Sequence, residues 1–396
     1  LRINGSIKSD SLKMYHRLVS DRKLNLGDLD VSIHSLINKN KIEIDSSTTV
    51  TMGKFFFSPY LSVEKDTSVK VNFVVNKERF HANDFFNSIP EGLMPTISGL
   101  QVAGDMSYHL ALSFDMNNLD SLQFSVNAKK YPDFKIKKYG NVNLTYPNDT
   151  FTYNAYLDGK LMRRIALNDR NPNYVKYKDV PEEVINCILY SEDPSFFRHR
   201  GFLESATKES LIKNLKEKRF ARGGSTISMQ LVKNLFLNQN KNLMRKAEEA
   251  ILVWLIEQNN LIPKERMLEI YVNVIEWGPN VYGLTEASRY YFDKSPNRLS
   301  PEEAIYLAMI IPRPRKFMYT FDNTGHLRDS YGPHFSKIKA KLYDNKIVRD
   351  TSRVRLEDVK LTGDAKKLLK VTESEVVSEP EEPRGIFKLF KRRRNR

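Results

Sequence analysis

The chain has 396 residues, 40% of them hydrophobic and 28% charged, which excludes a disordered or collagen-like protein and allows two or three domains. Its 63 basic and 48 acidic side chains give a net charge of +15, and its single cysteine excludes an internal disulfide and a cysteine-based zinc site. The longest apolar runs, 250–256 and 304–312, are far shorter than the ~20 residues of a transmembrane helix. Because the sequence opens at Leu1 without a signal-peptide pattern, we expect the natural N-terminus, with any membrane anchor, to precede it.

Residues 1–170 contain short runs in which apolar and polar residues alternate. Such runs occur at 29–34, 41–45, 69–75, 122–126, 142–146 and 151–156, and turn residues such as those at 147–149 separate them. A period of two is typical of strands with one covered face. We therefore expect a β-rich region at residues 1–170, and it contains no catalytic motif.

Residues 171–320 have helical periodicity instead. A turn-rich joint at 171–174 opens the region, and the remaining residues, 321–396, are a polar extension with a basic tail. An acidic, proline-bearing stretch at 373–383 predicts partial disorder there. The predicted fold class is thus α+β and multidomain, with boundaries near 170 and 320. Helices are expected at 181–189, 242–257, 264–274 and 300–311.

The positive charge is concentrated at the C-terminal end. The last 66 residues hold 18 basic and 10 acidic side chains, which is more than half of the net charge of the chain. A basic end attracts nucleic acid or an anionic membrane surface, and composition alone does not choose between these and a solvated tail.

Two adjacent carboxylates follow the first expected helix. Glu192 and Asp193 are followed by Phe196, Phe197 and His199. A carboxylate held against aromatic rings has a raised pKa, which suits proton abstraction near neutral pH. Ordinary acids at a helix end would give the same pattern, so these residues alone leave both interpretations open.

Residues 216–246 form a basic segment that contains a single acid. The turn at 223–226 precedes an expected helix and offers free backbone donors. Gln230, Lys233 and Asn234 then share one helical face, which a merely solvated basic surface does not explain. Donors and cations together suit a phosphate or pyrophosphate. The cations are Lys216, Lys218, Arg219, Arg222, Lys233, Lys241, Arg245 and Lys246.

Acidic residues return directly after this segment. Glu249 lies one helical turn after Arg245, and an exposed ion pair between them is the plain alternative to a functional role. The expected helix at 264–274 and a glycine-bearing turn at 277–283 complete the region.

Together these segments resemble the peptidoglycan glycosyltransferases, glycosyltransferase family 51, over about residues 173–316. The motifs occur in order: Glu-Asp-x-x-Phe-x-x-His-x-Gly from Glu192, Gly-x-Ser-Thr-x-x-Gln-Gln-x-x-Lys-Asn from Gly223, Arg-Lys-x-x-Glu from Arg245, and a fourth that includes Leu268, Glu269, Tyr271, Asn273 and Gly278. Two positions depart from the pattern, since Met229 replaces the first glutamine and Lys241 replaces a frequent arginine. Residues 1–170 match nothing in the family and are faintly similar to the β-rich periplasmic modules of AsmA-type membrane-associated proteins.

The resemblance implies a mainly α, lysozyme-like glycosyltransferase domain that polymerises lipid II into glycan strands, with inversion, and releases undecaprenyl pyrophosphate. It implies Glu192 as the general base, Asp193 as its support, and Glu249 as a catalytic residue and ligand of a divalent cation, Mg²⁺. The implied partners are lipid II, the growing strand, the membrane surface and other cell-wall synthesis proteins, but no nucleic acid. The implied location is the periplasmic face of a bacterial cytoplasmic membrane. The implied substrate and diphosphate residues are Phe196, His199, Arg222, Ser225, Thr226, Gln230, Lys233, Asn234, Lys241, Arg245 and Lys246.

Two alternatives stay open at this point. A lysozyme-like hydrolase or lytic transglycosylase also uses a glutamate, but its uncharged leaving sugar does not call for eight basic residues in 31 positions. A non-catalytic scaffold would bind a membrane or nucleic acid through its basic surface, but the aromatic–basic interleaving typical of single-strand binding is missing.

Overall fold

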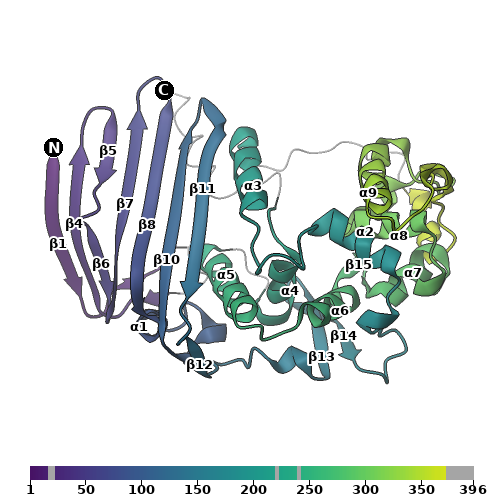
Figure 1. Ribbon diagram of the computed structural model, residues 1–396, viewed down its shortest axis with the longest axis horizontal. Coiled ribbons are helices and arrows are strands. Elements are labelled where there is room, and N and C mark those ends of the chain that lie inside the picture. The colour runs from purple at the N-terminus through teal and green to yellow at the C-terminus, as the bar shows by residue number, and fades with distance from the viewer. Residues whose placement is uncertain (17–22, 219–222, 239–241, 372–396) are drawn as a thin grey trace.

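The computed structural model describes residues 1–16, 23–218, 223–238 and 242–371. Strands dominate the N-terminal part and helices follow, as the purple-to-yellow colouring of Figure 1 shows. This arrangement confirms the predicted change from a β-rich region to a helical one. No helix within these ranges is long and apolar enough to cross a membrane.

Eight strands of the N-terminal part form one antiparallel sheet. The strand order is β1-β4-β5-β7-β8-β10-β11, and β6 pairs with both β4 and β7. Four of its pairs, β4/β5, β6/β7, β7/β8 and β10/β11, join strands that follow each other in the chain through short turns. Figure 1 shows β1 at one edge and β11 at the edge nearest the helices. The strands are β1 (Arg2–Ser9), β4 (Leu29–Ile37), β5 (Lys41–Ile44), β6 (Thr49–Met52), β7 (Phe55–Lys65), β8 (Val69–His81), β10 (Asp105–Asp115) and β11 (Asn118–Lys130).

The pairing register separates apolar from polar side chains. Phe73 in β8 lies opposite Leu61 and Leu112, and Leu112 lies opposite Phe124. The neighbouring Asn72 falls on the other face, since successive side chains of a strand alternate. The alternation that predicted strands in the sequence is therefore the alternation between the two faces of this sheet.

Smaller elements complete the N-terminal part and lead to the helices. The hairpin of β13 and β14 directly precedes the turn-rich joint that the sequence predicts. Two further two-stranded sheets pair β9 with β12 and β2 with β3. These elements are β2 (Lys13–Met14), β3 (Leu24–Asn25), α1 (Ala82–Ser88), β9 (Gln101–Ala103), β12 (Lys135–Lys138), β13 (Phe151–Leu157) and β14 (Lys160–Leu167).

The helical part begins with α2 and follows the predicted periodicity closely. Thr226 caps α4 and Asn242 caps α5, each by accepting a hydrogen bond from a first-turn backbone N–H. Ser300 and Glu303 form a reciprocal capping box at α8. The elements are α2 (Glu182–Glu192), α3 (Glu204–Glu217), α4 (Ile227–Phe236), α5 (Leu243–Gln258), α6 (Lys264–Val274), β15 (Glu276–Gly278), β16 (Val281–Tyr282), α7 (Leu284–Phe292), α8 (Pro301–Ile310) and α9 (Gly332–Asp344).

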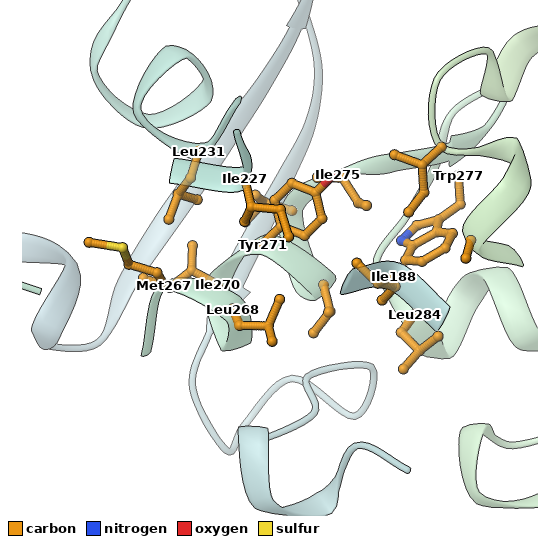
Figure 2. Close-up of a cluster of buried hydrophobic side chains, with 14 of the residues drawn as sticks. Ile188, Ile227, Leu231, Met267, Leu268, Ile270, Tyr271, Ile275, Trp277 and Leu284 are labelled. Atoms are coloured by element: carbon orange, nitrogen blue, oxygen red, sulfur yellow. The ribbon is translucent and has the colours of Figure 1, made fainter. Parts of the chain in front are cut away.

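The helices enclose the main hydrophobic core around α6, which is buried on nearly every side. Figure 2 shows Ile227 and Leu231 of α4 beside Ile270 and Tyr271 of α6. Buried side chains of α9 join the same core, so part of the extension after residue 320 belongs to the fold. The predicted disordered stretch and the basic tail lie outside the described residues.

The β-rich part is packed directly onto the helices. The Trp254 ring of α5 contacts Phe134 edge-on at 5.4 Å between centroids, and its Nε1 donates to the Ala128 carbonyl at 2.6 Å. The Asn148 amide donates to the Leu261 carbonyl at 2.8 Å. The domain limits at 170 and 320 stay a prediction, but one core is shared across the first of them.

Candidate active site

Glu192, the last residue of α2, is partly buried. Burial raises the pKa of its carboxyl above the ordinary value. The Gln230 amide donates to Glu192 Oε2 at 2.8 Å and lowers this pKa, while the charge of Asp193 raises it and the charge of Lys233 lowers it. Burial is the largest effect, so Glu192 is a stronger base than an exposed glutamate.

Tyr271 of α6 sets the orientation of Gln230. Its hydroxyl is completely buried and donates to Gln230 Oε1 at 3.1 Å. Burial, with the nearby charges of Glu192 and Asp193, raises the pKa of Tyr271, so the hydroxyl keeps its proton. Gln230 therefore turns its NH₂ group toward Glu192, and an ionised carboxylate, which only accepts, fits this arrangement. Sequence reasoning gave Tyr271 no role, because this contact joins residues 41 positions apart.

Asp193 is buried beside the first turn of α4. Both of its oxygens lie 2.9 Å from His199 Nε2, and Oδ2 also accepts from the Ile227 N–H at 3.1 Å. His199 Nδ1 accepts from the Gly201 N–H at 3.0 Å, so the ring proton sits on Nε2 and points at Asp193. Asp193 thus ties the end of α2 to the start of α4, which places Glu192 beside Gln230.

Phe196, His199 and Thr226, which the resemblance implies as substrate residues, lie inside the protein. Phe196 is 1% exposed, and Lys264 Nζ lies 4.3 Å from the centre of its ring. Thr226 donates to the Gly201 carbonyl at 2.7 Å. Because these three side chains are inside the protein, they fit a role in holding the site residues in place. A direct contact with substrate stays a prediction.

Gln230, Lys233 and Asn234 come from one side of α4, as their spacing predicts. Lys233 is exposed, and its charge acts on the pKa of Glu192. Met229, where the family usually has glutamine, is 8% exposed and belongs to the hydrophobic core. The apolar side chain therefore suits its surroundings.

Glu249 of α5 is 2% exposed and lies between two cations. Arg245 Nη1 donates to its Oε2 at 3.2 Å, and Lys246 Nζ donates to its Oε1 at 2.5 Å. The alternative of an exposed surface ion pair is therefore wrong, because the carboxylate is buried. Lys246 Nζ also donates to Ser225 Oγ at 3.4 Å, which links α5 to the loop before α4.

A divalent cation has no complete ligand set in the described part of the chain. No group of three or more His, Cys, Asp or Glu residues there is arranged to hold a metal ion. Both oxygens of Glu249 already accept from cationic side chains. Arg222 and Lys241, two of the implied diphosphate residues, lie outside the described residues.

A pocket of about 960 Å³ lies elsewhere on the molecule. Its walls come from β14, β16, α7 and the segment 362–367, and no residue of α2, α4 or α5 contributes. The location of this pocket therefore does not identify Glu192 as a site residue. The chemistry of the carboxylate and its neighbouring cations identifies the candidate site instead.

Comparison with known proteins gives the family of this chain. Residues 158–331 match the family model described as Transglycosylase. A biosynthetic peptidoglycan transglycosylase of Nitrosomonas eutropha is 42% identical over 170 residues, which are 41% of this chain and 68% of that relative. The chain belongs to the peptidoglycan transglycosylase family. Proteins of the same name from Azoarcus sp. and Aromatoleum aromaticum are 39% and 37% identical, over 40% and 44% of this chain and 71% and 75% of their own lengths.

This peptidoglycan transglycosylase is thus a glycosyltransferase that acts on peptidoglycan, which confirms the activity implied by its motifs. The matched segment holds Glu192, Gln230, Glu249 and Tyr271. The eight-stranded sheet and α9 lie outside it.

Proposed function

We propose that this peptidoglycan transglycosylase polymerises lipid II. The 4-hydroxyl of an acceptor lipid II attacks the anomeric carbon of the growing strand, with inversion, and undecaprenyl pyrophosphate leaves. The biosynthetic names of the relatives favour this reaction over lytic cleavage and over a non-catalytic basic scaffold. Such a reaction needs a base for the hydroxyl proton and positive charge for the leaving diphosphate.

The geometry of Glu192 is the observation that carries the proposal. Its raised pKa strengthens it as a base, while the Gln230 N–H and the Lys233 charge favour the ionised form that accepts a proton. Gln230 occupies Oε2, and no hydrogen bond to Oε1 is recorded in the described part of the chain. We assign Oε1 to the acceptor hydroxyl, and we assign Asp193 to holding α2 against α4.

The leaving diphosphate is assigned to the cations of α4 and α5. Lys233 is exposed on α4, and Arg245 and Lys246 are held in place by the buried Glu249. Pre-oriented cations stabilise developing negative charge without reorganising during the reaction. A Mg²⁺ ion stays a prediction, and because the described side chains do not supply its ligands, no step here depends on it. Arg222 and Lys241 complete the assignment from the sequence.

The proposed domain fold, cellular location and N-terminal module follow from the same resemblances. We propose that α2, α4, α5 and α6 belong to a lysozyme-like catalytic domain at about residues 171–320. We place the enzyme at the periplasmic face of a bacterial cytoplasmic membrane, where lipid II and other cell-wall synthesis proteins would meet it. The β-rich region at 1–170 is proposed as an AsmA-like module.

The test is polymerisation of labelled lipid II by the full chain and by Glu192→Gln. The amide keeps the shape of the side chain but cannot take the hydroxyl proton, so we expect the rate to fall by about 10²–10⁴-fold. Glu182→Gln, an exposed carboxyl in the first turn of the same helix, is the matched control and should retain the parent rate. Near-parent polymerisation by Glu192→Gln would refute the assigned base. A parent enzyme that only cleaved preformed glycan would refute the polymerase proposal.

A further inference from the structure

Thr96, a residue of the N-terminal part, contacts both α4 and α5. Thr96, in the short 3₁₀ helix η1 (Pro95–Ile97), is 6% exposed. Its hydroxyl donates to the carbonyl of Phe236, the last residue of α4, at 3.1 Å. Its backbone N–H donates to Oε1 of Glu248, in the second turn of α5, at 2.7 Å. One residue therefore contacts both helices that carry the assigned diphosphate cations.

Hydrogen bonds from the segment 141–142 hold the backbone around Thr96 in place. The Val142 N–H donates to the Thr96 carbonyl at 3.3 Å, and the Asn141 side chain donates to the Pro95 carbonyl at 2.9 Å. A Cβ added at Gly140 would lie 2.6 Å from the backbone carbonyl carbon of Ile97, so only glycine permits this approach. The turn around Thr96 is thus a rigid support rather than a loose loop.

The contact bears on the site because Glu248 precedes Glu249. Glu248 is 4% exposed and is bonded away from the site, toward Thr96, whereas Glu249 is bonded to Arg245 and Lys246. Adjacent residues of a helix point about 100° apart, so fixing Glu248 fixes the rotation of α5 about its axis. Catalytic groups need placement to within about 0.5 Å, and a small rotation of α5 would exceed this.

We propose that Thr96 and Glu248 position the reaction site by locking α5 against α4. Both are positioning residues that touch no substrate, and Thr96 belongs to a segment outside the matched family region. The β-rich part would then set the geometry of the diphosphate cations from a distance. The inference rests on the proposed roles of Lys233 and Glu249.

The first test compares kinetics and thermal stability of full-chain variants. Glu248→Ala removes the acceptor, and we expect kcat for lipid II polymerisation to fall about 10- to 100-fold with a smaller change in KM. Glu248→Gln keeps an acceptor oxygen for the Thr96 N–H and should restore most of the rate. Trp254→Phe is the matched control, since it removes a hydrogen bond from the same helix to the β-rich part. It should lower the melting temperature similarly and leave kcat unchanged.

The second test is coupling between Glu248→Ala and Glu249→Gln. If Glu248 acts through the group that Glu249 orients, the double variant should be about as slow as the slower single variant. If the rate losses of the two single variants multiply in the double variant, the proposal is wrong. It is also wrong if Glu248→Ala keeps the parent kcat while Glu249→Gln is slower. A full-rate Glu249→Gln would instead refute the proposed role of Glu249. Should Glu248→Ala fail to fold, Thr96→Val tests the other contact of the lock, because it removes the hydroxyl that donates to the Phe236 carbonyl and keeps the N–H that donates to Glu248. We expect kcat to fall in this variant too, and a parent-like kcat would overturn the proposal.

Discussion

Replacing Tyr271 by phenylalanine removes one buried hydroxyl, which in the described part of the chain donates to the Gln230 amide. In the parent, Tyr271 donates to Gln230 Oε1 at 3.1 Å, and Gln230 Nε2 donates to Glu192 at 2.8 Å. Tyr271→Phe leaves the partly buried Gln230 Oε1 without this donor, which costs about 1–3 kcal/mol of the free energy of unfolding. The Gln230 amide is then free to turn, and the bond that lowers the pKa of Glu192 weakens.

The kinetic consequence has a definite sign. The pKa of Glu192 is already raised by burial, and weakening the Gln230 bond raises it further. Because the base must be ionised, activity is lost as pH falls through this pKa, so the acidic limb of the variant should move to higher pH. A bond worth about 0.5–1.5 kcal/mol corresponds to a 2- to 10-fold loss of rate at a pH on the acidic limb.

The assay is the pH dependence of lipid II polymerisation, with unfolding by denaturant measured alongside. Tyr291→Phe is the matched control, because the Tyr291 hydroxyl is also buried and donates to the Trp277 carbonyl at 2.7 Å, away from the acids. We expect similar stability losses but a shifted acidic limb only for Tyr271→Phe. The reasoning is wrong if Tyr271→Phe and Tyr291→Phe have the same pH profile as the parent.

Two further substitutions distinguish residues that hold the site in place from residues that take part in the reaction. Asp193→Asn places an NH₂ group against either the His199 Nε2–H or the Ile227 N–H, so two donors face each other. We expect the free energy of unfolding to fall by about 1–3 kcal/mol and the activity to fall less than in Glu192→Gln. A stable Asp193→Asn as inactive as Glu192→Gln would give Asp193 a direct role in proton transfer. Glu249→Gln removes the buried charge that holds two cations, and we expect at least tenfold slower polymerisation and about 1–3 kcal/mol lower stability. An unchanged melting temperature would show that solvent screens the pair.

The sequence by itself determined much of the local structure and pointed to the groups that are proposed to react. Helical periodicity and capping residues placed α6 and α8 almost to the residue, because turns and caps depend on side chains three or four positions apart. The motifs predicted Glu192 and the basic segment as site residues for a similar reason, since each motif is short and continuous. Alternation likewise predicted the strands of the β-rich part, but not which strands pair.

Tertiary structure alone decided what surrounds these groups. The burial of Glu249, the Tyr271–Gln230–Glu192 series of bonds and the contact of Thr96 with α5 join residues from separate elements. An i,i+4 pair looks the same in a sequence whether its face is covered or exposed, so its energy and its role depend on what packs against it. The covering segments lie as far as 152 positions away in the chain, and their placement follows from the packing of the whole core.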